Sequence, residues 1–441
     1  MSWHLAASWQ RIAEAGNLEY AGGMDRSVEK FLGAVNQDEC TGILARLVRF
    51  RSTSGAPGEA DLARFLVDAM EALGLEAFLQ EVSPGRWNAI GIWRGTGGGR
   101  SVMLSGHIDT NPAGVGWTVD PWGGVVRDGF VYGLGVSNMK AGNAASLCAV
   151  KTLMEHGVAL PGDVMLTYVV GELQGGIGTL KMLDDGLRAD AFVTCEPTDL
   201  QALTLHAGSV DFIIELTGRT RHLSKRDEAV DALAAASALV PRINGATFSG
   251  AADEIHRSLN RAHVGLLRAA LTREFNEDRP PQVADFARLV GAARYAPGQS
   301  EASVLADLRR VLDELEEEYP GLDARVSARK AGAGLPPMLP FEVARDAAIV
   351  RSLNRAYEVV RHQAQPTGAV APPCFYWTDA AHLQHRGGME GVVCGPGGKY
   401  NTMPDERVEV ADYLDAIRLY MLVILDVCGW DGSGADSRDS P

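Results

Sequence analysis

Residues 102–110 read Val-Met-Leu-Ser-Gly-His-Ile-Asp-Thr, an apolar run followed directly by a histidine and an aspartate. The apolar run predicts a buried β-strand, and ligand sites in α/β sheets form beyond the carboxyl ends of the strands. His107 can bind a metal ion through one ring nitrogen. Asp109 points the same way in an extended chain and can orient the other nitrogen. A His–Asp pair that only stabilises the fold would show the same spacing.

Strands and helices alternate on both sides of this stretch. Apolar residues recur at helical spacing over residues 28–73, and residues 139–155 are also predicted to be helical. The predicted strands are residues 77–82, 89–93, 102–105, 163–170 and 191–195. Such alternation predicts an α/β sheet with helices on both faces.

The order of predicted strands and helices changes between residue 206 and about residue 330. Strands are predicted at 210–216, 286–294 and 322–329. Helices are predicted at 228–240 and 300–318. This order is typical of a small α+β sandwich of the split βαβ kind.

The chain then returns to the first pattern through a linker containing Pro336, Pro337 and Pro340. A helix at 345–363, a strand at 392–394 and a closing helix at 410–427 are expected. The predicted organisation is one α/β domain in two parts, residues 25–205 and 332–428. Residues 206–331 form an inserted domain, and residues 429–441 form a disordered tail.

Composition favours a folded protein, with 46% hydrophobic and 22% charged residues among 441. A formal net charge of -15 argues against partners such as nucleic acids and anionic membranes and leaves a small-molecule substrate open. The six cysteines show no CxxC spacing, so reduced thiols in a cytoplasmic protein are expected. Residues 1–24 are expected to form a short polar helix rather than a secretion signal, and no apolar stretch is long enough to span a bilayer.

Further motifs follow the first one in a fixed order. They are Asp128-Gly129-Phe130-Val131-Tyr132-Gly133-Leu134-Gly135, Asn138-Met139-Lys140, Gly171-Glu172-Leu173-Gln174-Gly175-Gly176, Cys195-Glu196-Pro197-Thr198, Thr378-Asp379-Ala380, Gly395-Pro396-Gly397 and Asn401-Thr402-Met403-Pro404-Asp405-Glu406. In this order, from about residue 37 to 425, they resemble the di-zinc exopeptidases and deacylases. That family includes succinyl-diaminopimelate desuccinylase, acetylornithine deacetylase, aminoacylase and carboxypeptidase G. The resemblance implies a zinc-exopeptidase-like α/β catalytic domain interrupted by a ferredoxin-like α+β lid domain, usually the element that forms a homodimer.

The resemblance also implies where metal should bind. One zinc ion would be held at His107 and Glu196, the other at positions 173 and 401, and position 138 would bridge the two. This chain has Leu173, Asn138 and Asn401 at three of these positions. An isobutyl group cannot ligate zinc, and neutral amides replace carboxylate and imidazole poorly. The second metal site is therefore expected to be lost.

The first site leaves two alternatives open. His107, Glu196 and the Asn138 oxygen could hold one zinc ion with Asp109 behind them, or the cluster could hold none and be only hydrogen-bonded. His382 and His385 could in principle substitute as ligands. Their spacing within a predicted helix at 380–385 favours surface or packing roles.

Three further residues match positions with a chemical role in the resembled family. Glu172 matches the general base, Arg294 a lid residue that binds the substrate carboxylate, and His222 a lid histidine that stabilises an oxyanion in the partner subunit's site. Without two flanking zinc ions, a carboxylate beside Leu173 in an apolar pocket should have a raised pKa and be a stronger base. The alternative is an inert remnant. Retention of Arg294 and His222 argues against it, because an inert scaffold needs neither a carboxylate clamp nor an oxyanion donor.

Three functions compete on this evidence. The first is a repurposed deacylase-like enzyme in specialised biosynthesis, in which Glu172 acts on an N-acyl or amide-bearing amino-acid-like substrate, with Asn138 and Asn401 as further contacts. Ring closure, acyl transfer or isomerisation would suit it, because an intramolecular attack gains its rate from proximity. The second is a one-zinc amidohydrolase that uses His107 and Glu196. The third is a non-catalytic binding dimer.

Overall fold

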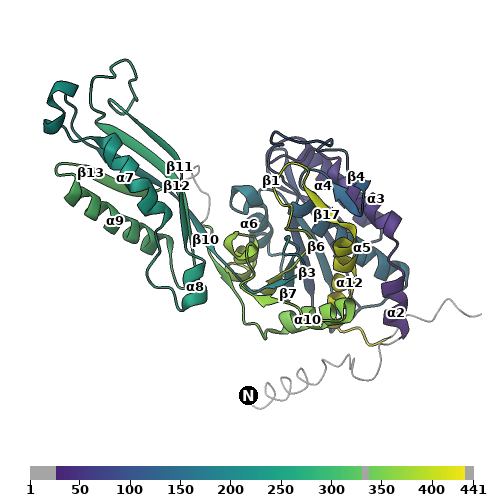
Figure 1. The fold of residues 1–441 in the computed structure, drawn as a ribbon. Helices are drawn as coiled ribbons and strands as arrows, with labels where there is room; N and C mark the ends of the chain where they lie inside the picture. Colours follow the sequence, from purple (N-terminus) through teal and green to yellow (C-terminus); the bar gives the residue numbers. More distant parts are fainter. Residues whose placement is uncertain (1–25, 330–336, 433–441) are drawn as a thin grey trace, which may run out of the picture. The chain divides into compact units, whose positions relative to one another are not determined.

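The computed structural model describes residues 26–329 and 337–432. The chain divides into two compact units, each described here by itself (Figure 1). Within the described residues, unit 1 comprises residues 26–204, Val343–Pro373 and residues 378–432. Unit 2 comprises Leu205–Glu342 and Cys374–Trp377. The predicted N-terminal helix and Pro336 lie outside the described residues, as does most of the predicted tail.

Unit 1 is built on an eight-stranded mixed sheet with the order β1-β2-β6-β3-β7-β16-β8-β15. Its strands are β1 (Glu76–Ser83), β2 (Arg86–Trp93), β6 (Val164–Val169), β3 (Val102–His107), β7 (Ala191–Thr194), β16 (Glu390–Val393), β8 (Ala202–Leu203) and β15 (Thr367–Gly368). β3 pairs parallel with both β6 and β7, and β2 pairs antiparallel with β1 and β6. Every residue of β3, β6 and β7 is buried, which explains their continuous apolar sequence.

Helices cover both faces of this sheet, as the alternating pattern predicts. The helices of unit 1 are α2 (Arg26–Gly33), α3 (Gln37–Val48), α4 (Gly58–Ala72), α5 (Ala141–Glu155), α6 (Ile177–Asp184), α10 (Ala348–Arg361), α11 (Ala380–His385) and α12 (Val410–Val427). Figure 1 shows α5 and α12 on one side of the central strands and α6 on the other. Leu104, Leu166 and Val193 belong to the core that α5 and α12 share with the sheet. β3 and β7 are thus fixed from both sides at the edge where the site forms.

The helix predicted from residue 139 begins two residues later, at Ala141. Val136–Lys140 forms an irregular turn instead, in which Asn138 has φ -119° and ψ 92°. Two short hairpin strands precede this turn, β4 (Val125–Arg127) and β5 (Phe130–Tyr132), and β5 also pairs with β17 (Arg407–Glu409). The turn therefore presents the Asn138 side chain beside β3 rather than along a helix.

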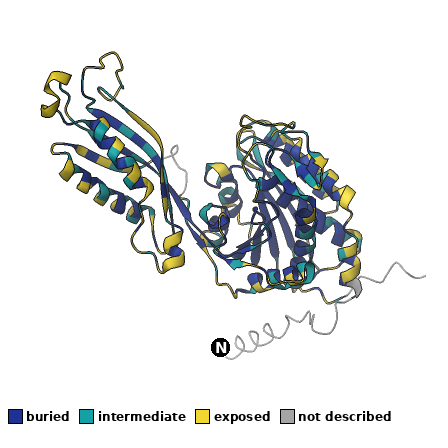
Figure 2. Cartoon of the chain, viewed as in Figure 1, coloured by how far each residue is buried: buried dark blue, intermediate teal, exposed yellow. Residues whose placement is uncertain are grey.

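Unit 2 contains a four-stranded antiparallel sheet with the order β11-β12-β10-β13. Its elements are β10 (Gly208–Thr217), α7 (Ala232–Asn244), α8 (Glu254–Ser258), β11 (Arg261–Ala270), β12 (Phe286–Tyr295), α9 (Glu301–Glu318) and β13 (Asp323–Ala328). The three strands and two helices predicted for the region are present as β10, α7, β12, α9 and β13, and the structure adds α8 and β11 between them. Figure 2 shows the buried residues of α7 and α9 on the sides that meet the sheet, where they pack on Phe212 and Leu216.

The strand β11 is missing from the sequence prediction. Most of its residues are exposed or half-buried, so it lacks the alternation of apolar and polar residues that reveals β10 and β12. A two-stranded pairing of β14 (Phe341–Glu342) with β9 (Leu205–His206) completes unit 2.

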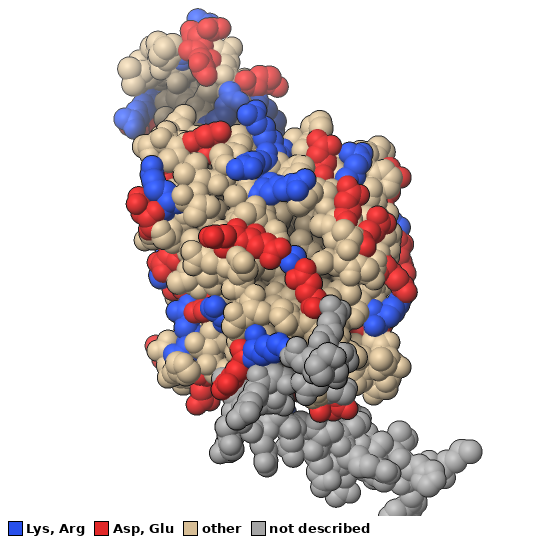
Figure 3. All heavy atoms as spheres, turned by 90° about the vertical axis from the view of Figure 1, so that its right-hand side faces the viewer, with Lys and Arg blue, Asp and Glu red and all other residues tan. Residues whose placement is uncertain are grey.

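The described surface is of mixed charge. Figure 3 shows acidic and basic side chains interspersed over one face, so no field of a single sign builds up there. Among the helices described, none is long and apolar enough to cross a membrane.

Candidate functional site

His107 is the last residue of β3 and is 2% exposed. Its Nδ1 donates to the backbone oxygen of Asp109 at 2.8 Å, while the nearer Asp109 carboxylate oxygen lies 3.6 Å away. The carbonyl rather than the carboxylate therefore makes the short bond that was expected to orient the ring. With a proton held on Nδ1, Nε2 is the nitrogen that faces the other site residues.

The Asp109 carboxylate ties β3 to the turn after β6. It accepts the backbone N–H of Gly171 at 2.9 Å and that of Glu172 at 3.3 Å, and the hydroxyl of Ser54 at 3.0 Å. Asp109 is completely buried. Its oxygens thus hold the start of the Gly-Glu-Leu-Gln-Gly-Gly turn beside His107, which fixes the backbone that carries Glu172.

Glycines are required in that turn. Gly171, Gly175 and Gly176 have φ of 77°, 83° and 76°, in the left-handed region that other residues avoid. A Cβ on Gly176 would lie 2.3 Å from an Asp379 oxygen. His382 donates from Nε2 to the carbonyl of Gly175 at 2.9 Å, which supports the turn from α11. The buried position of His382 agrees with the packing role expected for it.

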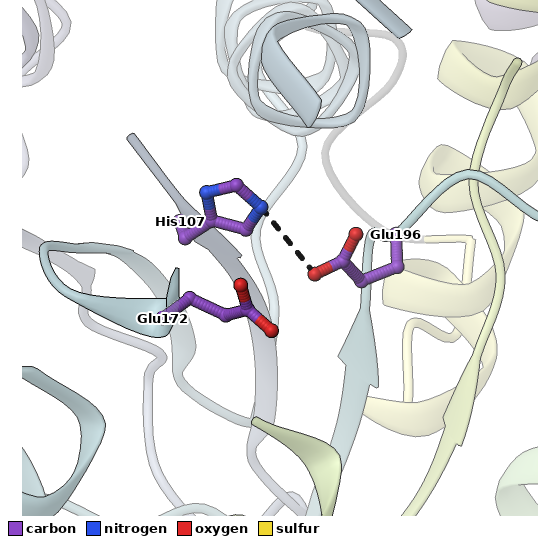
Figure 4. Close-up of side chains that lie close together, drawn as sticks. All are labelled: His107, Glu172 and Glu196. Carbon is purple, nitrogen blue, oxygen red and sulfur yellow. Dashed lines mark ion pairs between the residues drawn. The ribbon is translucent and has the colours of Figure 1, made fainter. Parts of the chain in front are cut away.

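His107, Glu172 and Glu196 meet at the end of the sheet (Figure 4). His107 ends β3, and Glu172 and Glu196 follow β6 and β7, the two strands that pair parallel with β3. Each offers one ligand atom within 4.8 Å of the others, and His107 Nε2 lies 3.6 Å from Glu196 Oε1. All three side chains are buried. The motifs that are distant in sequence are therefore brought into one cluster.

Burial governs the protonation of this cluster. It raises the pKa of Glu172 well above the usual range and that of Glu196 to about 7, since charged carboxylates lose hydration there. Burial alone would lower the pKa of His107, but the carboxylates around it, Glu196 first, raise that pKa well above 6.5. The raised pKa of Glu172 agrees with the sequence expectation, although its neighbours include charged groups as well as Leu173. The cluster can hold and exchange protons near neutral pH.

Asn138 joins the cluster through its amide. Its Oδ1 lies 2.8 Å from His107 Nε2. The buried carboxylate of Glu406 accepts the backbone N–H groups of Gly135, Ser137 and Asn138 at 3.1, 2.9 and 3.0 Å. Glu406 therefore holds the irregular turn in place. Asn138 contacts His107 as a neutral hydrogen-bond partner, and its role as a zinc ligand or a substrate contact stays a prediction.

Leu173 and Asn401 occupy the positions implied for the second ion. Leu173 is 39% exposed and lines a cavity of about 210 Å³ together with His107 and Asn138. The Oδ1 of Asn401 is buried and has no hydrogen-bond partner among the described residues. Neither side chain offers a group of the strength that zinc prefers.

The residues present fit one metal ion. Within residues 26–329 and 337–432, His107, Glu172 and Glu196 are the group of three ligand-type side chains that lie close enough together. One imidazole and two carboxylates are a suitable donor set for a single zinc ion. This set differs from the prediction, because Glu172 rather than Asn138 supplies the third strong donor.

Three residues considered from the sequence are not members of this cluster. His222 is exposed and precedes a short 3-10 helix (Leu223–Glu228), where its Nδ1 accepts the backbone N–H of Ser224 at 3.2 Å. Arg294 is half-buried on β12, in register with Ser209 of β10. Both belong to unit 2, so their roles toward the cluster in unit 1 stay predictions. His385 is exposed at the end of α11.

Two functional-site neighbours were not assigned a role from the sequence. Asp379 is buried beside the cluster, accepts the Thr179 hydroxyl at 2.8 Å, and adds its charge to those acting on Glu172. Arg86 makes a two-point ion pair with the buried Glu59 and also donates to Gln174 in the turn. Asp379 belongs to the Thr378-Asp379-Ala380 motif, so the sequence could have indicated it. No motif or spacing in the sequence indicates Arg86.

Comparison with known proteins agrees with this geometry. Residues 103–426 match the sequence profile of Peptidase family M20/M25/M40, and the chain belongs to this family. The aminopeptidase PepT of Bacillus cereus has the same fold, with a TM-score of 0.71 at 19% identity over 89% of this chain and 99% of that one.

Two curated relatives match over shorter segments. An N-formyl-4-amino-5-aminomethyl-2-methylpyrimidine deformylase of Halalkalibacterium halodurans is 32% identical over 176 residues, 38% of this chain and 41% of the relative. A succinyl-diaminopimelate desuccinylase of Rhodospirillum centenum is 34% identical over 163 residues, 35% of this chain and 42% of the relative. The matches span about two fifths of each relative's length. The activity and the substrate of this chain are therefore left to be proposed.

Proposed function

We propose that this chain transforms an amide or N-acyl bond of an amino-acid-like substrate, with Glu172 as the group that moves the proton. The observation that carries this is the burial of Glu172 against His107 and Glu196, with its pKa raised well above the usual range. A carboxylate with a raised pKa is a stronger base and is better matched to an amine, a hydroxyl or an acidic carbon near neutral pH. The second metal site of the resembled enzymes is lost in this proposal.

The reaction that suits this site best is non-hydrolytic. Leu173 places a hydrocarbon where a second cation would help to activate water, so ring closure, acyl transfer or isomerisation is favoured over ordinary hydrolysis. Glu172 would take the proton from the attacking group and, where an amide bond breaks, pass it to the leaving nitrogen. His107, kept protonated by its carboxylate neighbours, would stabilise developing negative charge. Arg294 would bind a substrate carboxylate and His222 would act in the partner subunit's site. A role in specialised biosynthesis follows from such a change of chemistry.

A one-zinc amidohydrolase is the second candidate function. It is favoured by the three ligand atoms of His107, Glu172 and Glu196 lying within 4.8 Å of one another. A zinc ion held by these residues would supply a Lewis acid at the cluster. In this candidate Glu172 binds metal, whereas in the first it moves a proton. The two functions therefore assign incompatible roles to one side chain.

Replacing Glu172 separates the candidates. We expect Glu172→Gln to lower turnover of N-acyl and amide-bearing amino acids by at least about 100-fold, with the zinc content per chain unchanged. In the one-zinc candidate the same substitution lowers the zinc content as well as the rate. Glu81→Gln, at an exposed position on β1, is the matched control and should change neither quantity. Turnover is measured by mass spectrometry and zinc by elemental analysis of purified protein.

The same experiment addresses the non-catalytic alternative. A binding dimer predicts that Glu172→Gln leaves every measured property intact. Absence of turnover in the wild type, with every other property unchanged in this variant, would favour the binding dimer. Full retention of turnover in this variant would remove both roles proposed for Glu172.

A homodimer formed through unit 2 and a reducing compartment complete the proposed function. All six cysteines are buried and unpaired, which suits the reduced thiols of a cytoplasmic protein. Cell fractionation would test the compartment, and recovery of the chain outside the cytoplasm would contradict it.

A further inference from the structure

The cavity of about 210 Å³ beside the cluster is lined by both polar and apolar side chains. The polar ones include His107, Asp109 and Asn138. The apolar ones include Trp117, Leu173 and Met403, which are called the apolar wall here. Leu173 directly follows Glu172 in the chain, so the apolar wall begins next to the cluster.

The apolar wall stays open to a ligand. Leu173 is 39% exposed and Met403 44% exposed, and large apolar side chains that stand exposed around a concave site mark ligand contacts. If the second metal position had only decayed, a small polar residue would serve equally well at position 173. A leucine that lines the cavity gives this position an apolar contact of its own.

Two carboxylates fix the walls of the cavity in place. Asp405 accepts the backbone N–H of Thr118 at 2.8 Å and its hydroxyl at 2.6 Å, which binds the segment of Trp117 to the segment of Met403. Glu406, the next residue, holds the Asn138 turn through three backbone N–H groups. The three loops around the cavity are therefore tied to one another, as a preformed subsite requires.

We propose that Leu173, Met403 and Trp117 form an apolar subsite for the hydrocarbon part of the substrate, an acyl chain or a single ring placed next to His107. This inference rests on the proposed function and names its substrate class. A cavity of about 210 Å³ has room for a group of several heavy atoms. The position that binds a metal in the resembled enzymes recognises hydrocarbon in this one.

Equilibrium binding of N-acylglycines tests the subsite. Isothermal titration of the purified wild type and of Glu172→Gln with N-acetyl-, N-butanoyl-, N-hexanoyl- and N-benzoylglycine should show affinity rising about fourfold per added methylene until the cavity is filled. N-benzoylglycine should bind at least about tenfold more tightly than N-acetylglycine. Affinity that does not depend on the acyl group overturns the proposal.

A substitution in the wall gives the second arm. Leu173→Asn should reduce the preference for hexanoyl over acetyl at least about fivefold and leave N-acetylglycine binding within about twofold. Val115→Asn is the matched control, because Val115 lies in the same loop as Trp117, is 94% exposed and does not line the cavity. If Leu173→Asn does not fold, Met403→Ser carries the same expectation. Equal weakening of all four ligands contradicts the subsite.

Binding and turnover separate the two proposals. An acyl preference that persists while Glu172→Gln remains fully active sinks the proposed proton transfer and keeps the subsite. Loss of activity in Glu172→Gln, with affinity that does not depend on the acyl group, supports the proposed proton transfer and contradicts the subsite.

Discussion

Asp379 is a buried carboxylate with incomplete hydrogen bonding. Its Oδ2 accepts the Thr179 hydroxyl at 2.8 Å, whereas its Oδ1 is buried and has no hydrogen-bond partner among the described residues. Burial raises the pKa of Asp379 from 3.8 to about 6. A carboxyl whose pKa is raised by folding stabilises the fold below its unfolded pKa, and this contribution is lost as pH rises through the folded value.

The stability of Asp379→Asn should therefore increase relative to that of the wild type as pH rises. Relative to the wild type, the free energy of unfolding of this variant should increase by about 3 kcal/mol between pH 3.5 and pH 7.5, at about 1.4 kcal/mol per pKa unit. Urea unfolding of chelator-treated protein at the two pH values measures this difference. Asp68→Asn, at an exposed position of α4, is the control and should show no such change. The same offset from wild type at both pH values would contradict the assignment.

The three residues at the second metal position can be tested together. Leu173→Glu, Asn138→Asp and Asn401→His restore two carboxylates and one imidazole, the strong donors whose replacement was noted in the sequence. We expect the triple variant to bind one more zinc ion per chain than the wild type, measured by elemental analysis after dialysis. Leu173→Glu alone should not, because one carboxylate is too weak a site. An unchanged zinc content in the triple variant would show that the second metal site differs from that of the resembled enzymes in more than these three side chains.

Residue types and motif order predict much of the site. They identify His107, Glu172 and Glu196, which the fold brings together. They do not predict that the Asp109 carbonyl rather than its carboxylate makes the short bond to the ring, since this depends on the path of the backbone after β3. Nor do they reveal Arg86, because its partners Glu59 and Gln174 are close only once the chain is folded.

At the scale of elements, Arg86 joins α4, β2 and the turn that carries Glu172. Its guanidinium makes two bonds of 2.7 Å to Glu59, whose side chain is completely buried. It also donates to Gln174, two residues beyond Glu172. Removing one partner leaves the other charge buried and unpaired. The loss of stability should therefore be larger when one partner is replaced than when both are replaced by apolar residues.

Arg86→Met should lower the free energy of unfolding by about 3–5 kcal/mol at pH 7. The double variant Arg86→Met with Glu59→Leu should recover most of this loss, because no unpaired charge remains. Guanidinium unfolding of the wild type, both single variants and the double variant gives the coupling energy. Additive single and double effects would mean that the ion pair does not stabilise the turn.

Helices and strands follow from periodicity wherever one face is apolar. α12 spans Val410–Val427 as predicted, and the three buried strands that carry the site lie where their apolar runs indicate. The irregular turn Val136–Lys140 is not predicted, because Glu406, distant in sequence, supplies the hydrogen bonds that hold it. Long-range side-chain contacts override local propensity at this point.

At the scale of the whole molecule, the sheet of unit 2 has an edge strand that could pair with a second copy of the chain. Among the residues that the structure describes, β11 pairs only with β12, so it is an edge strand, and it runs for ten residues from Arg261 to Ala270. It exposes Leu266 at 45% and Leu267 at 36%. A long edge strand with exposed apolar residues is a template for pairing with another chain unless it is protected. The homodimer predicted from the family resemblance would cover this edge.

We expect the protein to elute as a dimer of about 94 kDa, twice the chain mass of 47.1 kDa, in size-exclusion chromatography with light scattering. Leu266→Lys combined with Leu267→Lys should shift it to a monomer, because charges on an edge strand oppose pairing. Ile255→Lys, at a position 45% exposed on α8, is the control and should remain dimeric. A wild type that elutes at the mass of one chain would exclude the dimer, and with it the proposal that His222 acts in a partner subunit's site. A dimer that survives the double substitution would move the interface away from β11 and leave His222 to be tested by its own replacement.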